Sequence, residues 1–574
     1  MQRRSFVSVS ALTAAGALLA ACRGGLGSGS DGSVSGGSAS DGASSGGGAS
    51  DGASSDGGTS AAPAEFQELE AHIMGQRVTA RVSPLVRLEE TATALVVELT
   101  RAADDAAVND VQEFQHFDDI LFASNYLGTP PLGTGADGVR LIDTAGAGRV
   151  WVAGSATGGG LKLKPGETAA SAVIFAPVDI DQVTALVPQT GFVTVSVIGR
   201  DQADAAGISS EVLAEADKAL KDKSGPGEKA AVVDLERYTR AIDDSASTHT
   251  TDKDVTVTLA SDVTFDPDSY NLTDKADSQL QTVADQIAQY PDGGTLDIVG
   301  HTDDVADDAH NQKLSEDRAA AVKDRLGQLT DLAKWEVTTT GKGESEPAVD
   351  GTTDEARAAN RRVVITITPT GGAASSTAPS ATPSSAPSAA PSSSAPGGTA
   401  LPEPQGQVGA GPDGVTAVYP SIGSFDSSEQ VTITLPQVVR AGGLLFGRLS
   451  VTVGPRGADD NSVLSDWFDD DEFLLSNARG EDGSLVATIG AVNGLTLLAG
   501  GERVFPADYL DGDRQVHLPL SECNLFKSLK EGAVTTVCAV WPDTGQETVT
   551  LDHQAYKDDP WHAFRLTDIP VVSA

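Results

Sequence analysis

The sequence is poor in cysteine and in basic residues, and its one marked apolar run is short. Its 574 residues contain three cysteines, and 39 Lys and Arg stand against 81 Asp and Glu, a formal net charge of −42. A chain this acidic repels nucleic acid and anionic lipid surfaces, so we expect neither as a direct partner. The apolar run Phe6–Ala21 is shorter than a permanent transmembrane helix, which needs about 20 residues.

The N-terminus has the pattern of an export signal over residues 1–22. Arg3 and Arg4 precede the apolar run, which ends at Leu19-Ala20-Ala21-Cys22. This ending resembles the bacterial lipobox, which implies that the Cys22 thiol receives a diacylglyceryl group and becomes the mature N-terminus. Two acyl chains suffice for stable anchoring in a membrane. The alternative is a chance cysteine in a signal without a lipid. Gln2–Val7 also resembles a twin-arginine signal, with departures on both sides of the arginines.

The two remaining cysteines are candidates for a disulfide. If Cys22 is acylated, Cys523 and Cys538 are left to pair in an oxidising compartment. Their surroundings are rich in predicted strands, which suits a bridge across a hairpin or between sheets. Two buried thiols are the alternative, and the sequence leaves both open.

Two stretches of low complexity divide the chain. Residues 23–62 are rich in Gly, Ser, Ala and Asp and predict a flexible linker, whereas the prolines of 371–404 predict a stiffer one. Three folded regions are therefore expected, at 63–245, 252–370 and 405–574.

The first and last regions read as mostly β, because short β-branched runs alternate with Gly and Pro turns. The clearest predicted strands are Leu95–Leu99, Val139–Ile142, Val193–Ile198, Val431–Leu435, Leu449–Val453 and Val534–Val540. A helical stretch is predicted from Ser209 to Ile242. A weak echo between 160–167 and 494–502 suggests two copies of one immunoglobulin-like sandwich.

The central region alternates strands and helices, as an α+β domain does. The apolar spacing predicts strands at Val255–Leu259, Thr295–Gly300, Trp335–Thr340 and Arg362–Thr368, and helices at Thr273–Tyr290 and Asn311–Leu329. The predicted fold class is therefore multidomain, with a central α+β domain between two mostly-β sandwiches.

One residue breaks the apolar pattern of the second helix. Arg318 lies four residues after Leu314 and four before Val322, in a row on the inward edge of the helix. A buried guanidinium needs a partner. Thr302 and Asp303 lie just beyond the preceding strand, where ligand sites often form. The residues alone favour a structural ion pair between Asp303 and Arg318. A zwitterion trap, with Asp303 on an ammonium and Arg318 on a carboxylate, is the alternative.

The wider pattern changes this balance. Gly300-His301-Thr302-Asp303, Asn311, Leu314-Ser315 and Arg318-Ala319 together resemble the signature of the OmpA-like family, which includes peptidoglycan-associated lipoproteins. Phe265–Ser269, Gly341–Pro347 and Asn360–Val363 resemble its opening and closing segments, so that the resemblance covers about a fifth of the chain.

The resemblance implies binding to the diaminopimelate of the peptidoglycan stem peptide. Asp303 would take the ammonium group and Arg318 the carboxylate, Asn311 and Leu314 would shape the pocket, and Thr302 and Arg361 would contact the ligand. Two residues depart from the family pattern: Ala306 stands where Gly is usual, and His310 where Tyr is usual.

No metal, cofactor or catalytic site is expected. The loop with His301, Asp303, Asp304 and His310 lacks the spacing of a calcium or zinc site, and we interpret it as a solvated acidic loop. The same holds for Trp467–Glu472. We find no nucleophile and base in a credible strand-turn-helix setting, so a non-enzymatic protein is predicted. A wall hydrolase with paired carboxylates is the competing interpretation.

The predicted function is tethering. A lipid on Cys22 would hold the chain at the outer face of the cell membrane while the central domain binds the cell wall. In the alternative, the protein is an adhesin or assembly scaffold whose β-rich regions bind another protein.

Overall fold

The computed structural model describes residues 64–73, 75–105, 138–145, 148–157, 163–221, 230–371, 401–421, 428–457, 464–468, 492–511, 516–520, 529–554 and 561–574. The predicted signal with Cys22, the first linker and Cys523 lie outside the described residues, so the predictions of a lipid anchor and a disulfide stay predictions. Across the described residues, every helix is either too short or too polar to traverse a membrane.

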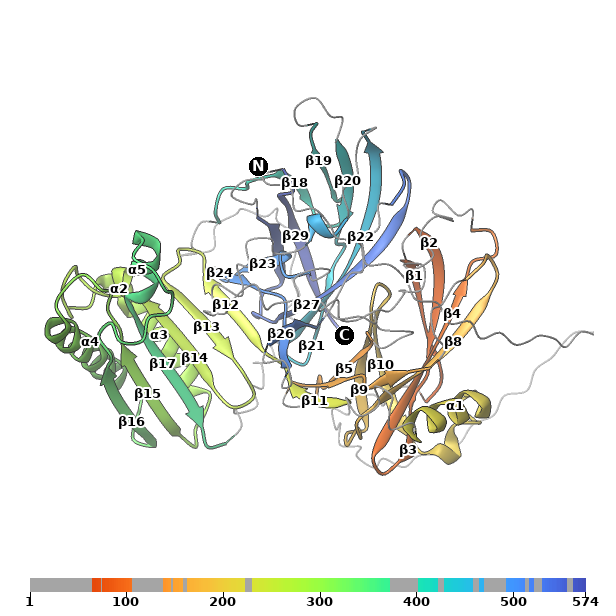
Figure 1. Ribbon diagram of the computed structural model, residues 1–574, viewed down its shortest axis with the longest axis horizontal. Helices are drawn as coiled ribbons and strands as arrows, with labels where there is room; N and C mark the ends of the chain where they lie inside the picture. Colours follow the sequence, from red (N-terminus) through yellow and green to blue (C-terminus); the bar gives the residue numbers. More distant parts are fainter. Residues whose placement is uncertain are drawn as a thin grey trace, which may run out of the picture. The chain divides into compact units, whose positions relative to one another are not determined.

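The central region folds as an α+β domain (Figure 1). Four strands lie in the order β16-β15-β17-β14, with β15 parallel to β16 and antiparallel to β17. The strands are β14 (Val255–Ala260), β15 (Gly294–Gly300), β16 (Trp335–Gly341) and β17 (Arg362–Pro369). The helices are α2 (Ser261–Thr264), α3 (Asp274–Ala288), α4 (Asp308–Leu329) and α5 (Asp354–Asn360). All predicted strands and helices of this region are confirmed within a turn at each end.

Helix α3 and helix α4 pack together over one core with the sheet. Thr273 begins α3 by accepting a hydrogen bond from the backbone N–H of Ala276, which satisfies one of the free donors of the first turn. The buried side chains that form this core are Leu280, Val283, Ala284 and Ile287 of α3, Ala319, Val322 and Leu326 of α4, and Leu296, Ile298, Val363, Ile365 and Ile367 of the sheet. Each buried Leu, Ile or Val stabilises the fold by about 1.5–3 kcal/mol, which fixes α4 on the sheet and positions the residues it carries.

Two strands that precede this domain in the sequence extend its sheet beyond β14. β13 (Ala246–Thr250) pairs antiparallel with β14, and β12 (Arg237–Ala241) pairs antiparallel with β13. The predicted helix Ser209–Ile242 is therefore only partly right, because α1 ends at Lys221 and strands follow. The β-branched run after Ala230 favours a strand, and the pairing with neighbouring strands outweighs the helical spacing.

The first region is β-rich, as predicted, and adds one helix and one 3-10 turn. Its strands are β1 (Gln67–Ile73), β2 (Gln76–Val82), β3 (Leu85–Glu89), β4 (Ala92–Arg101), β5 (Arg140–Ile142), β6 (Arg149–Val152), β7 (Ser155–Ala156), β8 (Thr168–Phe175), β9 (Gln182–Val187), β10 (Gly191–Ile198) and β11 (Ala231–Asp234). Its helices are η1 (Arg200–Gln202) and α1 (Ser210–Lys221). Its three clearest predicted strands are confirmed by β4, β5 and β10, although β5 begins one residue later than predicted, at Arg140.

The last region is also β-rich. Its elements are β18 (Gln407–Ala410), β19 (Val415–Tyr419), β20 (Glu429–Thr434), β21 (Val438–Ala441), β22 (Leu444–Arg456), η3 (Leu464–Trp467), β23 (Thr496–Ala499), β24 (Glu502–Val504), β25 (Asp508–Asp511), β26 (Val516–Pro519), β27 (Val534–Pro542), β28 (Thr548–His553) and β29 (Phe564–Ser573). Its predicted strands are confirmed by β20, β22 and β27, although β20 ends one residue earlier than predicted, at Thr434. The molecule is thus multidomain and rich in sheet, while the immunoglobulin-like topology of the flanking regions stays a prediction.

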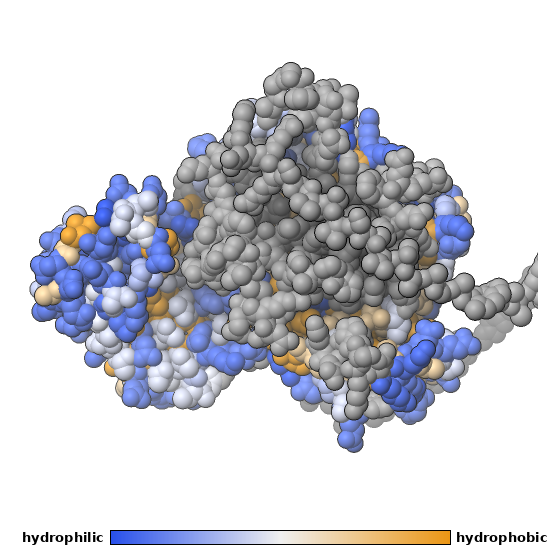
Figure 2. All heavy atoms as spheres, viewed as in Figure 1, coloured by the Kyte–Doolittle hydropathy of each residue, from blue (hydrophilic) through white to orange (hydrophobic). Residues whose placement is uncertain are grey.

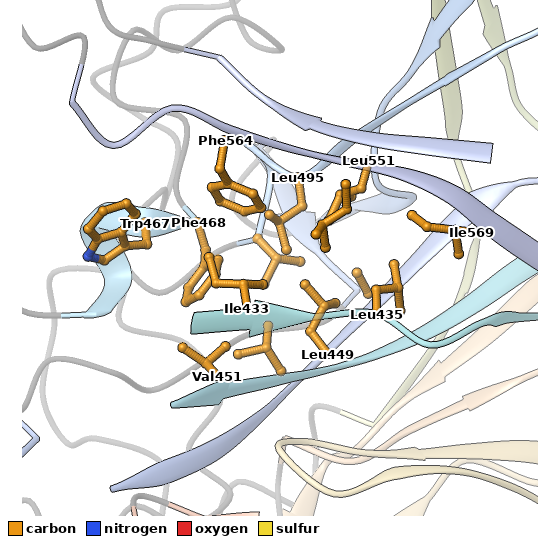
Figure 3. Close-up of a cluster of buried hydrophobic side chains, with 14 of the residues drawn as sticks. Ile433, Leu435, Leu449, Val451, Trp467, Phe468, Leu495, Leu551, Phe564 and Ile569 are labelled. Atoms are coloured by element: carbon orange, nitrogen blue, oxygen red, sulfur yellow. The ribbon is translucent and has the colours of Figure 1, made fainter. Parts of the chain in front are cut away.

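The core of the last region corrects one prediction. Trp467 and Phe468 were expected in a solvated loop, but both are fully buried among aliphatic side chains of the sheet, such as Ile433 and Leu449 (Figure 3). The indole N–H of Trp467 donates to a carboxylate oxygen of Glu429 at 3.0 Å, which satisfies its buried donor. The acidic residues that follow Phe468 suggested a solvated loop, and they lie outside the described residues.

Candidate functional site

The loop between β15 and α4 carries Thr302 and Asp303. It lies close to the sheet because Gly300 ends β15 against the backbone of α4, where a Cβ atom would overlap the carbonyl oxygen of Ser315. Asp307 begins α4 by accepting a hydrogen bond from the backbone N–H of His310 at 3.1 Å. A glycine at the strand end and a cap at the helix start therefore fix both ends of the loop.

Asn311 holds this loop from inside. Its Nδ2 donates to the carbonyl oxygens of Asp303 and Ala306 at 3.0 and 3.2 Å, and to a carboxylate oxygen of Glu344 at 2.7 Å. The side chain is buried, with 2% of its surface exposed. Asn311 thus orders the backbone around Asp303.

Asp303 is held by Arg361. Arg361 Nη1 donates to Asp303 Oδ2 at 2.7 Å, while its Nε and Nη2 donate to the carboxylate of Asp262 at 2.7 and 2.5 Å. Hydrogen bonding to Asp262 raises the pKa of Arg361 above its ordinary value against the opposing effect of burial. The other oxygen of Asp303 accepts from the backbone N–H of Val305 at 3.3 Å. Arg361 therefore orients the carboxylate that the sequence singled out.

Arg318 is buried, and none of the described residues offers it a carboxylate partner. Only 5% of its surface is exposed, its Nε donates to the carbonyl oxygen of Ser269 at 2.9 Å, and its guanidinium lies 5.2 Å from the centre of the Phe265 ring. Within the described part of the chain, no Asp or Glu oxygen comes within 4.0 Å of it, and no hydrogen bond engages its two Nη groups. Burial lowers the pKa of Arg318, and the nearby charges of Asp262 and Asp268 oppose this.

The described structure does not contain the ion pair between Asp303 and Arg318 that the residues alone favoured before the wider motif was considered. Asp303 pairs with Arg361 instead, and the guanidinium of Arg318 keeps its two Nη groups for another acceptor. A guanidinium in that state is suited to fork a carboxylate with two parallel hydrogen bonds.

A pocket of about 140 Å³ opens beside Asp303. Four carboxylates contribute to its wall, and the complete lining is Thr302, Asp303, Asp304, Glu344, Pro347, Val349, Asp350, Gly351 and Asn360. Arg357 neutralises one of them, because its Nε donates to Asp304 Oδ1 at 2.7 Å. The hydroxyl oxygen of Thr302 is buried and has no hydrogen-bond partner among the described residues. The pocket is thus suited to a cation that can also bond a hydroxyl group.

The structure places other predicted residues outside this pocket. Leu314, Asn311 and Arg318 do not line it, and Leu314 is half-buried on α4. His301 is buried, and burial, with a smaller effect of Arg362, lowers its pKa to about 4, so that it is neutral at pH 7. His310, one of the two departures from the family pattern, lies 3.0 Å from a carboxylate oxygen of Asp268 on the exposed side of α4.

Two site residues escaped the sequence analysis. Asp262 binds Arg361 although 99 positions separate them, and Glu344 anchors Asn311 across 33 positions. No local spacing could have indicated either contact, because each joins different segments of the fold. Glu344 lies in the segment Gly341–Pro347 that resembles the family, but no role was predicted for it.

Comparison with known proteins identifies this domain. Residues 264–361 match the OmpA family. Outer membrane porin F of Pseudomonas aeruginosa is 44% identical over 102 residues, which are 18% of this chain and 29% of the porin. The putative lipoprotein YfiB of Escherichia coli is 33% identical over 111 residues, 19% of this chain and 68% of that protein. Among solved structures, the peptidoglycan-associated lipoprotein from Burkholderia pseudomallei is 30% identical and matches 18% of this chain and 86% of its own, with a TM-score of 0.16.

The matched share of each relative determines which inferences the match supports. The chain spans less than a third of the length of porin F, so the match to the porin concerns this domain and not the whole porin. It spans two thirds of the lipoprotein YfiB, and the family assignment rests on these sequence relatives. The resemblance drawn from the motifs around Asp303 and Arg318 is confirmed, and the chain belongs to the OmpA family.

Proposed function

We propose that the central domain binds peptidoglycan non-covalently, by gripping the diaminopimelate side chain of the stem peptide. The ammonium group would lie against Asp303 and the carboxylate against Arg318. The observation that carries the proposal is the guanidinium of Arg318, which is buried, charged and without a carboxylate among the described residues. Burying such a charge costs free energy, and a bound carboxylate would offset that cost.

The acidic pocket supports the other half of the proposal. Asp303 presents a carboxylate that is 16% exposed and already oriented by Arg361, so little ordering is left for binding. The buried hydroxyl of Thr302 offers an unused donor and acceptor at the same wall. A ligand that carries both an ammonium group for Asp303 and a carboxylate for Arg318, as an amino-acid zwitterion does, would satisfy both residues at once.

We also propose that a lipid on Cys22 anchors the protein at the outer face of the cell membrane. The lipobox-like ending supports this, as does the name of the Escherichia coli relative, a putative lipoprotein. Residues 23–62 would span from the membrane to the wall. The protein would then tether the membrane to peptidoglycan without catalysing a reaction.

Sedimentation with purified sacculi tests wall binding. Full-length protein in detergent would be mixed with sacculi and centrifuged, and wild type would be compared with Arg318→Met and Asp303→Asn. The matched control is Arg325→Met, because Arg325 lies on the same helix but pairs at the surface with Asp277 at 2.8 Å. Wild type and control should sediment, and both site variants should stay in the supernatant. Equal sedimentation of all four proteins would refute the site.

The β-rich regions are proposed to bind a protein partner, with immunoglobulin-like modules as their architecture. On the face drawn in Figure 2 the described surface is mostly hydrophilic with small hydrophobic patches. Large apolar side chains are exposed singly, for example Val418 and Trp561, and single exposures are normal on any surface. Wall binding by the central domain is therefore the better supported function.

A further inference from the structure

Three side chains that no short motif connects meet beside the start of β12. Glu236 precedes β12, His249 lies in β13 and His517 lies in β26 (Figure 1). His249 Nε2 is 2.5 Å and His517 Nε2 is 2.8 Å from the same carboxylate oxygen of Glu236. The sequence separations from Glu236 are 13 and 281 residues, so that the fold alone assembles the group.

Strand register explains the meeting. Tyr238 pairs with His249 in the antiparallel β12–β13 ladder, so Glu236, two residues before Tyr238, faces the same side as His249. On its other side Glu236 bridges Asp508, with backbone hydrogen bonds of 2.8 and 3.3 Å. Asp508 pairs with Pro519 in β25–β26, and His517 is two residues from Pro519 on the same face. The three side chains therefore project to one side of adjoining strands.

We propose that Glu236, His249 and His517 form a binding site for a divalent transition-metal ion, with zinc as the best match. One ligand atom from each side chain lies within 4.8 Å of the others. Around a tetrahedral zinc ion with bonds of about 2.0–2.2 Å, ligand atoms are about 3.4 Å apart. The two imidazole nitrogens, at 2.5 and 2.8 Å from the Glu236 oxygen, therefore lie within about 1 Å of the separation from that oxygen that zinc requires. Two neutral imidazoles and one carboxylate form a His₂Glu ligand set.

The chemistry of the ligands selects the ion. Imidazole nitrogen suits zinc, copper and nickel, whereas calcium and magnesium prefer oxygen ligands only. Three protein ligands leave a fourth position for water. His249 is 27% exposed, while His517 and Glu236 are 11% and 9% exposed, so the group is accessible from the side of His249.

The surroundings hold the imidazole rings in place. The Tyr238 ring lies 6.4 Å from that of His249 and 5.4 Å from that of Phe505, and the two histidine rings lie 6.2 Å apart at 74°. Packed rings of this kind orient metal ligands before the ion arrives. Because β13 and β26 come from distant parts of the chain, a bound ion would cross-link them and stabilise the folded state by mass action.

Metal titration of the full-length chain tests the site. Protein stripped with a chelator would be titrated with zinc chloride by calorimetry and with cobalt chloride by absorption, for wild type, Glu236→Gln and His517→Gln. The matched control is His310→Gln, since His310 also contacts a carboxylate, that of Asp268, but no third potential ligand joins this pair among the described residues. Wild type and control should bind one equivalent, and each ligand variant should lose affinity by about 100-fold or more.

Two results would overturn the proposal. One is zinc binding of the same affinity in wild type and both ligand variants. The other is a cobalt spectrum with thiolate bands, which would place the ion on cysteine. A third variant, His249→Gln, guards against misfolding, because His249 is the most exposed of the three ligands; its circular dichroism should match that of wild type while its zinc affinity falls.

Discussion

Replacing Arg318 by methionine should stabilise the ligand-free protein while it removes wall binding. Methionine follows the aliphatic stem of arginine with a flexible apolar side chain, but it is shorter and lacks the guanidinium group and its charge. The change removes the hydrogen bond from Nε to the Ser269 carbonyl oxygen and the contact with the Phe265 ring. It also removes a buried guanidinium that has no carboxylate partner among the described residues.

The free energies of these contributions determine whether the substitution stabilises or destabilises the protein. A hydrogen bond from a charged donor contributes about 1.5–3 kcal/mol, and a cation–π contact about 0.5–2 kcal/mol. The desolvation of a buried ion costs several kcal/mol, and even a buried ion pair can often be replaced by apolar side chains with a neutral effect or a gain of about 1–4 kcal/mol. The net gain expected for Arg318→Met is about 1 kcal/mol. This corresponds to roughly fivefold slower hydrogen exchange in α4 and β15.

Hydrogen–deuterium exchange of the full-length protein, followed by mass spectrometry, measures this locally. Arg325→Met is the control on the same helix, and its effect should stay within about 0.5 kcal/mol because Arg325 pairs at the surface. Faster exchange in Arg318→Met than in wild type would refute the reasoning. It would show that Arg318 is a structural residue whose interactions in the free protein exceed its desolvation cost.

Two further predictions follow from the structure, and a third follows from the sequence around Cys22. The pKa of His301 is about 4 in the folded state and 6.5 in the unfolded state, so the unfolded state binds more protons between these pH values. The free energy of unfolding should therefore fall by about 3 kcal/mol as the pH falls from 6.5 to 4. Urea unfolding of wild type should show this loss, and His301→Gln should lack it. Gly300→Ala should destabilise the domain by about 2 kcal/mol through overlap with the Ser315 carbonyl oxygen. Gly327→Ala, whose added Cβ in α4 would make an ordinary van der Waals contact with Leu332 Cδ1 at 3.9 Å, should stabilise it by about 0.5–1 kcal/mol. Equal exchange protection in the two variants would contradict this. Cys22→Ser should move the protein from the membrane fraction to the supernatant of lysed cells, and unchanged fractionation would exclude the lipid anchor.

The central domain was predictable because its signals are local. The apolar spacing of α3 and α4 and the alternating strands lie within short windows, and Arg318 stood out as a charge in a buried row. The same local view failed at residues 231–241, where pairing with β6, β13 and β24 determines a strand. It also failed at Trp467, whose burial depends on a distant sheet.

The candidate site divides in the same way. Asp303 and Arg318 were singled out from one loop and one helix, and the resemblance to the OmpA-like family added Asn311. The partner of Asp303 was not, because Arg361 reaches it from the end of the domain and is itself fixed by Asp262. The cluster around Glu236 gave no sequence signal, since His517 joins it through tertiary strand pairing.

The most direct test compares two stem peptides that differ in one group. Calorimetry of the full-length protein would use a muropeptide with diaminopimelate and the matching one with lysine, which keeps the side-chain ammonium but lacks the second carboxylate. If Arg318 binds that carboxylate, wild type should prefer diaminopimelate by about 10–100-fold, the value of one charged hydrogen-bonded pair. Arg318→Met should bind both peptides weakly and equally. Equal affinity of wild type for the two peptides would contradict the proposed role of Arg318.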